Sequence, residues 1–226
     1  MEIYHVLSRG VDRRNIFLDD HDRFRFIHDL FEFNDTKPAN NVAYLLRKSN
    51  DIVSRYKRDL LVEILAFCLM PNHYHLLLTP LTENGVSFFM RKLNIGYAKY
   101  FNEKNRRQGT LFEGRYKSIV IKKEAHFYHL PHYLHLNPLD LILPQWRERT
   151  LEAKEYKKAM TFLETYRWSS FLDYCGKENF PSITQRDLVL DAFGGKDRYQ
   201  QSLQDWLGKP STETRKLTTY DVVNWD

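Results

Sequence analysis

Two histidines near the middle of the chain have the spacing of a metal-binding pair. His73 and His75 flank Tyr74 at the start of an apolar run that has the length and composition of a strand. Side chains alternate between the two faces of a strand, so both imidazoles project from one face, about 7 Å apart at their α-carbons, while Tyr74 points to the other face. Two neutral imidazoles at that separation can converge on one divalent cation. A half-exposed packing pair is the alternative for the triplet taken alone.

A second pair of candidate residues lies further along the chain. Tyr133 and Asn137 are four residues apart in an expected helix, so they lie on the same helix face, one turn apart. If that helix crosses the histidine-bearing face of the sheet, Asn137 can offer a carboxamide oxygen as third ligand and Tyr133 a phenol beside the metal. Two imidazoles, one hard oxygen ligand and open positions suit Mg²⁺ or Mn²⁺ better than structural zinc. The alternatives are a core aromatic for Tyr133 and a helix C-cap for Asn137.

Positive charge is concentrated in one stretch. The 226 residues contain 34 Lys and Arg against 29 Asp and Glu, a net charge of +5, whereas residues 91–123 contain ten basic residues and two acidic ones. Tyrosines and phenylalanines are interspersed among these charges, and the combination of phosphate-pairing and stacking groups is typical of a nucleic-acid surface. A solvated helix face followed by a loop is the alternative. The residues assigned to phosphate contacts are Arg106, Arg107, Arg115, Lys117, Lys122 and Lys123.

The elements expected around these residues follow the order β-α-β-β-α-β-α. Strands are expected at 3–8, 61–70, 73–80 and 117–123, and helices at 19–34, 84–104 and 124–136. Two helices covering one face of an antiparallel sheet in this order form the ferredoxin-like split βαβ arrangement, so the sequence predicts an α+β fold. Pro131 lies inside the last of these helices, where it can kink the helix and shift Tyr133.

The domain expected to carry the chemistry spans residues 1–139, with an insertion at about 35–60. A helical extension over 140–226 follows, with helices at 149–166, 184–193 and 196–207 and a polar tail. Hydrophobic and aromatic contents of 42% and 15% exclude a disordered chain. No apolar run is long enough to span a membrane, no signal peptide is evident, and Cys68 and Cys175 are too far apart in sequence to suggest a disulfide scaffold. We therefore expect a soluble protein of the cytoplasm.

Five motifs in order along the chain resemble a known family. They are SRGVDRRNIF at 8–17, CLMPNHYHLLL at 68–78, GTLFEGRYKS at 109–118, YLHLNP at 133–138 and YRWSSF at 166–171. Together they are similar to the HUH-endonuclease transposases with a single catalytic tyrosine, and most similar to the branch that includes REP-associated tyrosine transposases. The resemblance covers roughly residues 3–175.

The resemblance implies a role for each candidate residue. His73 and His75 match the histidines that bind the divalent metal, Tyr133 matches the nucleophilic tyrosine, and Asn137 falls where the family has a polar third ligand. Attack by the tyrosine would leave a 5′-phosphotyrosine and a free 3′-OH. A phenol with a pKa of about 10 is a poor nucleophile at neutral pH, so the metal would have to make the scissile phosphate more reactive.

The implied substrate is single-stranded DNA, with a hairpin or palindrome nearby, and the protein is expected to act as a monomer or homodimer. Arg9, Arg13 and Arg14 follow the first strand and are candidates for backbone or base-edge contacts, with an exposed basic turn as the alternative. The main rival function is a non-catalytic single-stranded nucleic-acid-binding module on the same fold. A zinc hydrolase would need a carboxylate near the histidines, and residues 64–82 contain none.

Overall fold

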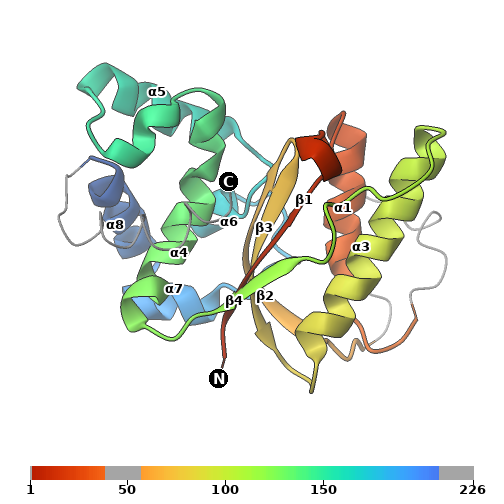
Figure 1. Cartoon of the computed structure of the whole chain (residues 1–226). Coiled ribbons are helices and arrows are strands. Elements are labelled where there is room, and N and C mark those ends of the chain that lie inside the picture. Colours follow the sequence, from red (N-terminus) through yellow and green to blue (C-terminus); the bar gives the residue numbers. More distant parts are fainter. Residues whose placement is uncertain (1, 39–56, 209–226) are drawn as a thin grey trace. The chain divides into compact units, whose positions relative to one another are not determined.

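The computed structural model describes residues 2–38 and 57–208 (Figure 1). The chain forms two compact units. The first comprises Met1–Val120 and Phe180–Gln185, and the second comprises Ile121–Asn179 and Arg186–Asp226. Most of the insertion expected at 35–60 and the polar tail from residue 209 lie outside the described residues. The boundary between the two compact units therefore lies after Val120. The expected end of the catalytic domain near residue 139 stays a prediction.

The first unit contains a four-stranded antiparallel sheet. Its strands are β1 (Tyr4–Arg9), β2 (Val62–Met70), β3 (His73–Pro80) and β4 (Lys117–Val120), in the order β2-β3-β1-β4. All neighbouring strands are antiparallel, and a turn at Pro71-Asn72 joins β2 to β3. This order is that of the ferredoxin-like arrangement, so the predicted fold is confirmed. β4 ends at Val120, three residues before its predicted end.

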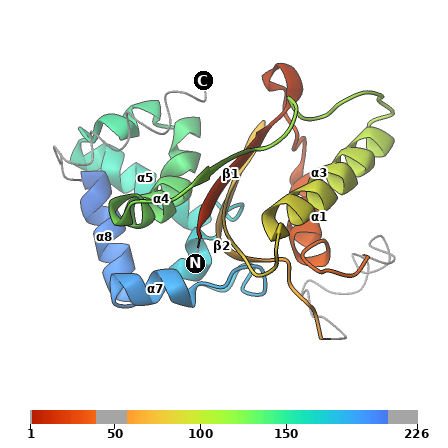
Figure 2. The ribbon, with the colours of Figure 1, turned by 60° about the horizontal axis from the view of Figure 1, so that its bottom comes forward.

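Two helices cover one face of this sheet. They are α1 (Asp20–Glu32) and α3 (Gly85–Lys104), and Figures 1 and 2 show them side by side on that face. Tyr74 points toward them: its ring centroid lies 4.6 Å from that of Phe26, and its hydroxyl donates a hydrogen bond to Asn94 of α3. Because side chains alternate along β3, His73 and His75 project from the opposite face.

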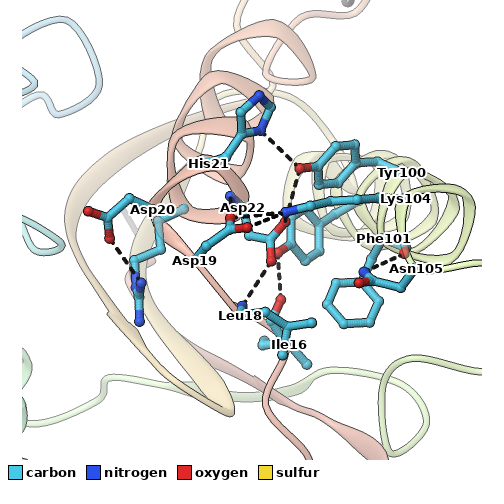
Figure 3. Close-up of polar contacts among 12 residues, drawn as sticks. Ile16, Leu18, Asp19, Asp20, His21, Asp22, Tyr100, Phe101, Lys104 and Asn105 are labelled. Carbon is cyan, nitrogen blue, oxygen red and sulfur yellow. Dashed lines mark hydrogen bonds and ion pairs between the residues drawn. The ribbon is translucent and has the colours of Figure 1, made fainter.

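A charged network joins the start of α1 to the end of α3 (Figure 3). The Lys104 ammonium donates to Asp19 Oδ2 at 2.7 Å and to Asp22 Oδ1 at 2.6 Å, and the Tyr100 hydroxyl donates to the same Asp22 oxygen at 2.9 Å. Asp19 also caps α1, because its side chain accepts a hydrogen bond from the Asp22 backbone N–H. The Asp22 side chain is fully buried, so its charge depends on these partners. The charge of Lys104 therefore stabilises the fold and does not contribute to the basic surface.

The second unit is helical. Its elements are α4 (Glu124–Leu136), two 3₁₀ helices at Asn137–Leu141 and Pro144–Glu148, α5 (Ala153–Thr165), α6 (Phe171–Tyr174), α7 (Asp187–Phe193) and α8 (Lys196–Gly208). α4 has its predicted bounds and continues through Pro131. α5 begins four residues later than predicted because Arg149 has a left-handed backbone with φ 56°, which no right-handed helix accommodates. The structure starts α5 instead at a capping box formed by Glu152 and Glu155.

One predicted helix begins late for a different reason. α7 was expected from residue 184 but starts at Asp187, because residues 180–185 belong to the first unit. There the Gln185 N–H donates to the Ile64 carbonyl at 2.9 Å, and the Gln185 side chain accepts from the Ile64 N–H at 2.9 Å. None of the helices within residues 2–38 and 57–208 combines the length and apolar composition needed to cross a bilayer.

Candidate active site

The face of the sheet opposite α1 and α3 presents the histidine pair. Arg9 lies directly opposite His73, and Leu7 opposite His75, in the β1–β3 register. Directly opposed residues share a face, so both imidazoles stand beside β1. Their ring centroids are 5.0 Å apart, with an interplanar angle of 85°, and His75 is only 5% exposed. The structure therefore brings His73 and His75 together as the sequence predicts.

Each imidazole of the pair is anchored through Nδ1. His73 Nδ1 lies 2.7 Å from the Asn72 side-chain oxygen, which can only accept, so His73 donates from Nδ1. His75 Nδ1 lies 2.9 Å from His5 Nε2, and when His75 donates in this pair its Nε2 carries the lone pair. With Nδ1 protonated in both residues, the Nε2 atoms of His73 and His75 have the electronic state that a divalent metal requires.

His5 is a site residue that the sequence analysis missed. It lies on β1, two residues before Leu7 and so on the face that carries His75. Burial lowers the pKa of His5 to about 4, so this imidazole is neutral at physiological pH and can accept a hydrogen bond. Its period-two spacing with Leu7 and Arg9 was visible in the sequence, but the pairing of β1 with β3 was not.

A basic turn and a basic loop lie at the end of the sheet where β3 begins. We name residues 10–16, which follow β1, the β1 turn, and residues 105–116, which precede β4, the β4 loop. The Gly10 N–H donates to the Asn72 carbonyl at 2.8 Å, and the Val11 N–H donates to the Leu111 carbonyl at 2.9 Å. A Cβ on Gly10 would lie 2.3 Å from the Arg14 carbonyl oxygen, so the turn requires glycine there. These bonds place the β1 turn and the β4 loop beside the residue that anchors His73.

The structure distinguishes among the predicted DNA-contacting residues. Those with exposed side chains in the first unit are Arg13, Arg14, Arg106, Arg115 and Lys117. The guanidinium of Arg107 ties the β4 loop to the end of α3, because it donates to Asn102 Oδ1 of α3 at 2.7 Å and to the Thr110 carbonyl at 2.9 Å. Arg9 is half-buried beside His73, and the exposed Lys122 and Lys123 belong to the second unit. Contact with DNA stays a prediction for all of them.

The second unit holds the other two predicted site residues. Asn137 is the C-cap of α4, and its backbone N–H donates to the Tyr133 carbonyl, so the capping alternative is correct for its backbone. Its side chain is 1% exposed, and its Oδ1 has no hydrogen-bond partner among the described residues. A buried carbonyl oxygen without a partner costs about 1 to 3 kcal/mol. A metal ligand role would satisfy this oxygen.

The donor set of His73, His75 and Asn137 therefore fits a divalent cation by its chemistry. The two imidazoles, each held through Nδ1, belong to the first unit. The amide oxygen, which lacks a partner among the described residues, belongs to the second unit. Among the described residues no group of three or more His, Cys, Asp and Glu side chains could hold a metal ion. A metal site built on the histidine pair would therefore depend on a ligand of another type, the amide of Asn137.

Tyr133 lies among aromatic and cationic side chains and is 3% exposed. Its ring centroid is 6.4 Å from that of His129 and 6.3 Å from that of Trp146. The guanidinium carbon of Arg147 lies 5.8 Å from the centre of the Tyr133 ring. Burial lowers the pKa of His129 to about 3, so this neighbour is neutral at physiological pH. The positive charge closest to Tyr133 in this group is that of Arg147.

Comparison with known proteins gives one family. Residues 3–137 match the family described as "Transposase IS200 like". No curated protein matches the chain at a significant level. The structure is similar to "Structure of the REP associates tyrosine transposase bound to a REP hairpin", with 13% sequence identity, a TM-score of 0.48, and coverage of 80% of this chain and 82% of that chain.

The family match covers more than half of the chain. It includes all four strands and extends to Asn137, so it contains both the histidine pair and Tyr133. The chain therefore belongs to the IS200-like transposase family.

Proposed function

We propose that this protein is a metal-dependent endonuclease and strand transferase that cleaves single-stranded DNA through a 5′-phosphotyrosine intermediate. Tyr133 is the nucleophile, and His73, His75 and Asn137 hold Mg²⁺ or Mn²⁺. The observation that carries the proposal is the histidine pair on one face of β3, with both Nδ1 atoms anchored. Membership of the IS200-like transposases supports it, because members are typically HUH tyrosine nucleases and usually depend on a metal.

The proposed reaction exchanges one phosphate ester for another. The Tyr133 oxygen forms a bond to phosphorus while the bond from phosphorus to the 3′ oxygen breaks. The phenol proton leaves to water and the 3′ oxygen takes one up, so the step releases no net proton. A bound divalent metal would polarise the scissile phosphate and offset charge developing on its oxygens. The protein–DNA ester conserves the energy of the broken bond, so a 3′-OH can reverse the step without ATP.

The substrate we propose is single-stranded DNA beside a hairpin or palindrome. The β1 turn and the β4 loop lie at the His73 end of the sheet, and their exposed arginines can pair with phosphates or base edges there. A single strand can place an unstacked nucleotide against such a site, which a regular duplex does not offer. A neighbouring hairpin would bind as a rigid structure, so the scissile phosphate would lie at a set distance from it.

The test compares two tyrosine variants of the same helix. Wild-type protein, Tyr133→Phe and Tyr128→Phe are incubated with Mn²⁺ and an end-labelled single strand that contains a hairpin, and then separated under denaturing conditions. We expect a covalent adduct with wild type and Tyr128→Phe and none with Tyr133→Phe, while all three still bind DNA. An adduct with Tyr133→Phe would refute the nucleophile. Binding without any adduct in the wild type would identify the non-catalytic binding module instead.

A further inference from the structure

An anchored arginine lies next to the proposed nucleophile. Arg147, in the 3₁₀ helix Pro144–Glu148, donates from Nη2 to Asp140 Oδ2 at 2.6 Å and from Nη1 to the other oxygen of the same carboxylate. Asp140 also accepts a hydrogen bond from the Trp146 indole N–H at 2.6 Å. The guanidinium carbon lies 4.7 Å from the centre of the Trp146 ring. A two-point contact of this kind fixes the plane of the guanidinium as well as its position.

The electrostatic relation between Arg147 and Tyr133 is mutual. Burial alone would lower the pKa of Arg147, but hydrogen bonding to Asp140 and the proximity of the Tyr133 phenol together raise this pKa above its ordinary value. An interaction between guanidinium and phenolate that favours the charge on one partner favours the charge on the other by the same free energy. Arginine keeps its proton at physiological pH, so it acts here as a fixed charge and not as a base.

The guanidinium also has an unsatisfied donor. Nε of Arg147 is buried, and within the described part of the chain it has no hydrogen-bond partner. The terminal nitrogens are held by Asp140, so the guanidinium cannot turn freely to serve another group. A buried donor that lacks a partner in the resting protein is stabilised when negative charge develops beside it.

From this arrangement we propose that Arg147 stabilises the negative charge on the Tyr133 oxygen as the phenol proton leaves, and that Asp140 positions Arg147 for this task. The inference rests on the proposed function, in which that oxygen attacks the phosphorus. The charge of Arg147 offsets the main weakness of a phenol as nucleophile, which is the small fraction of phenolate at neutral pH. No proton is transferred to Arg147: the phenol proton passes to water, as in the proposed reaction.

The experiment measures the pH dependence of single-turnover cleavage at saturating DNA. Arg147→Gln and Arg147→Met remove the charge, Arg147→Lys keeps it, and Arg198→Gln is a matched control at an exposed arginine of α8. We expect both neutral variants to lose about ten- to a hundred-fold in rate at neutral pH. We expect the acid limb of their pH profiles to move upward by about one pH unit. Arg147→Lys should keep the acid limb of the wild type, and Arg198→Gln should match the wild type in rate and profile.

A second measurement needs neither DNA nor metal. The ultraviolet absorbance of tyrosinate is followed as the pH is raised, in the wild type and in Arg147→Gln. The same titrations of Tyr133→Phe and of the double variant Tyr133→Phe, Arg147→Gln give, by difference, the contribution of Tyr133. We expect Tyr133 to ionise at higher pH in the Arg147→Gln protein. Two neutral variants are used so that a folding defect in one leaves the comparison intact.

The outcomes separate this inference from the proposed function. Adduct formation by the wild type, together with unchanged pH profiles in the neutral variants, would overturn the inference alone. Weaker DNA binding with an unchanged rate at saturation would also overturn it, because Arg147 would then be a simple phosphate contact. A wild-type protein that forms no adduct would overturn the proposed function and this inference with it.

Discussion

His75 owes its orientation to a residue from another strand. Its Nδ1 is 2.9 Å from His5 Nε2, and the two rings are nearly parallel, with an interplanar angle of 17°. Cys68 of β2 lies directly opposite His75 on its other side. His75 is thus constrained from both neighbouring strands, whereas His73 depends on the adjacent Asn72. A ligand held in this way loses little freedom when it binds a metal.

Replacing His5 should therefore weaken metal binding without removing a ligand. In His5→Phe the ring remains but cannot accept from His75, so His75 loses the partner that fixes its tautomer. We expect Mn²⁺ affinity to fall by about ten- to a hundred-fold, measured by calorimetric titration. His21→Gln, an exposed histidine of α1, is the control and should bind Mn²⁺ like the wild type. Equal affinities for His5→Phe and the wild type would show that His5 only fills space.

The sequence was informative about individual site residues where the signal is local. The alternation of β3 placed His73 and His75 on one face, and the four-residue spacing placed Tyr133 and Asn137 one turn apart. His5 could not be found in this way, because its role depends on which strand pairs with β3 and in which register. Arg147 was missed for a similar reason: its position depends on two short 3₁₀ helices with no periodic pattern.

Among the structural elements, the β1 turn and the β4 loop form one basic rim. The Val11 N–H donates to the Leu111 carbonyl at 2.9 Å, and Gly10 forms an isolated β-bridge with Phe112. These backbone contacts hold the two segments together without using the charged ends of the exposed arginines. Phosphate contacts and base contacts have different consequences, so the two segments can be told apart by mutation.

Paired substitutions should separate these two kinds of contact. Arg106→Gln with Arg115→Gln should weaken binding to cognate and scrambled single strands alike, and should reduce the salt dependence by about 0.7 units of log–log slope for each phosphate that is no longer neutralised. Arg13→Gln with Arg14→Gln should instead reduce discrimination by about 1 to 3 kcal/mol for each base edge that is no longer bound. Fluorescence anisotropy at several salt concentrations measures both effects.

The control for this comparison is Lys99→Gln, at an exposed lysine of α3 on the other face of the sheet. It should leave both affinity and discrimination unchanged. Arg107 is left intact because its guanidinium braces the β4 loop. Equal decreases in affinity for cognate and scrambled strands in the Arg13 and Arg14 pair would make the β1 turn a part of the electrostatic surface only.

Elements with strong local patterns were predicted well from the sequence. The bounds of β3 and α4 agree with prediction because local signals mark them: the Pro71-Asn72 turn precedes β3, and Pro138 follows the end of α4. The start of α5 was wrong because the left-handed backbone of Arg149 has no signature in its residue type. The start of α7 was wrong because the preceding segment pairs with Ile64, a contact between residues far apart in the chain.

Across the whole molecule, several histidines are buried in the neutral state. Burial, assisted by Arg25, lowers the pKa of His28 to about 4, and burial with Arg149 nearby lowers the pKa values of His129 and His132 to about 3. The ordinary value is 6.5, so below that pH the unfolded chain binds protons that the native protein does not. Stability from these groups is complete above the unfolded pKa and is lost as the pH falls below it.

Acidification should therefore destabilise the protein. Asp29 acts in the opposite direction, because burial, despite Arg25, raises its pKa to about 7 and its native form takes up a proton first. His5 and His135 are also buried in the neutral form, with pKa values of about 4 and about 3. With all five histidines and Asp29 included, we expect the free energy of unfolding to fall by about 4 to 5 kcal/mol between pH 7 and pH 5.5. Urea denaturation at the two pH values measures this change. His28→Gln should reduce the difference by about 1 kcal/mol, and a stability that rises on acidification would contradict the assignment.

The return of residues 180–185 to the first unit has a consequence for the integrity of that unit. β2 is the outer strand of the sheet, and an uncovered outer strand presents backbone groups that can pair with the same strand of another molecule. Gln185 occupies both the N–H and the carbonyl of Ile64 on that strand. A fragment that ends at residue 139 would keep all four strands yet lose this cover. Such a fragment should self-associate through β2, so the late part of the chain protects the sheet from aggregation.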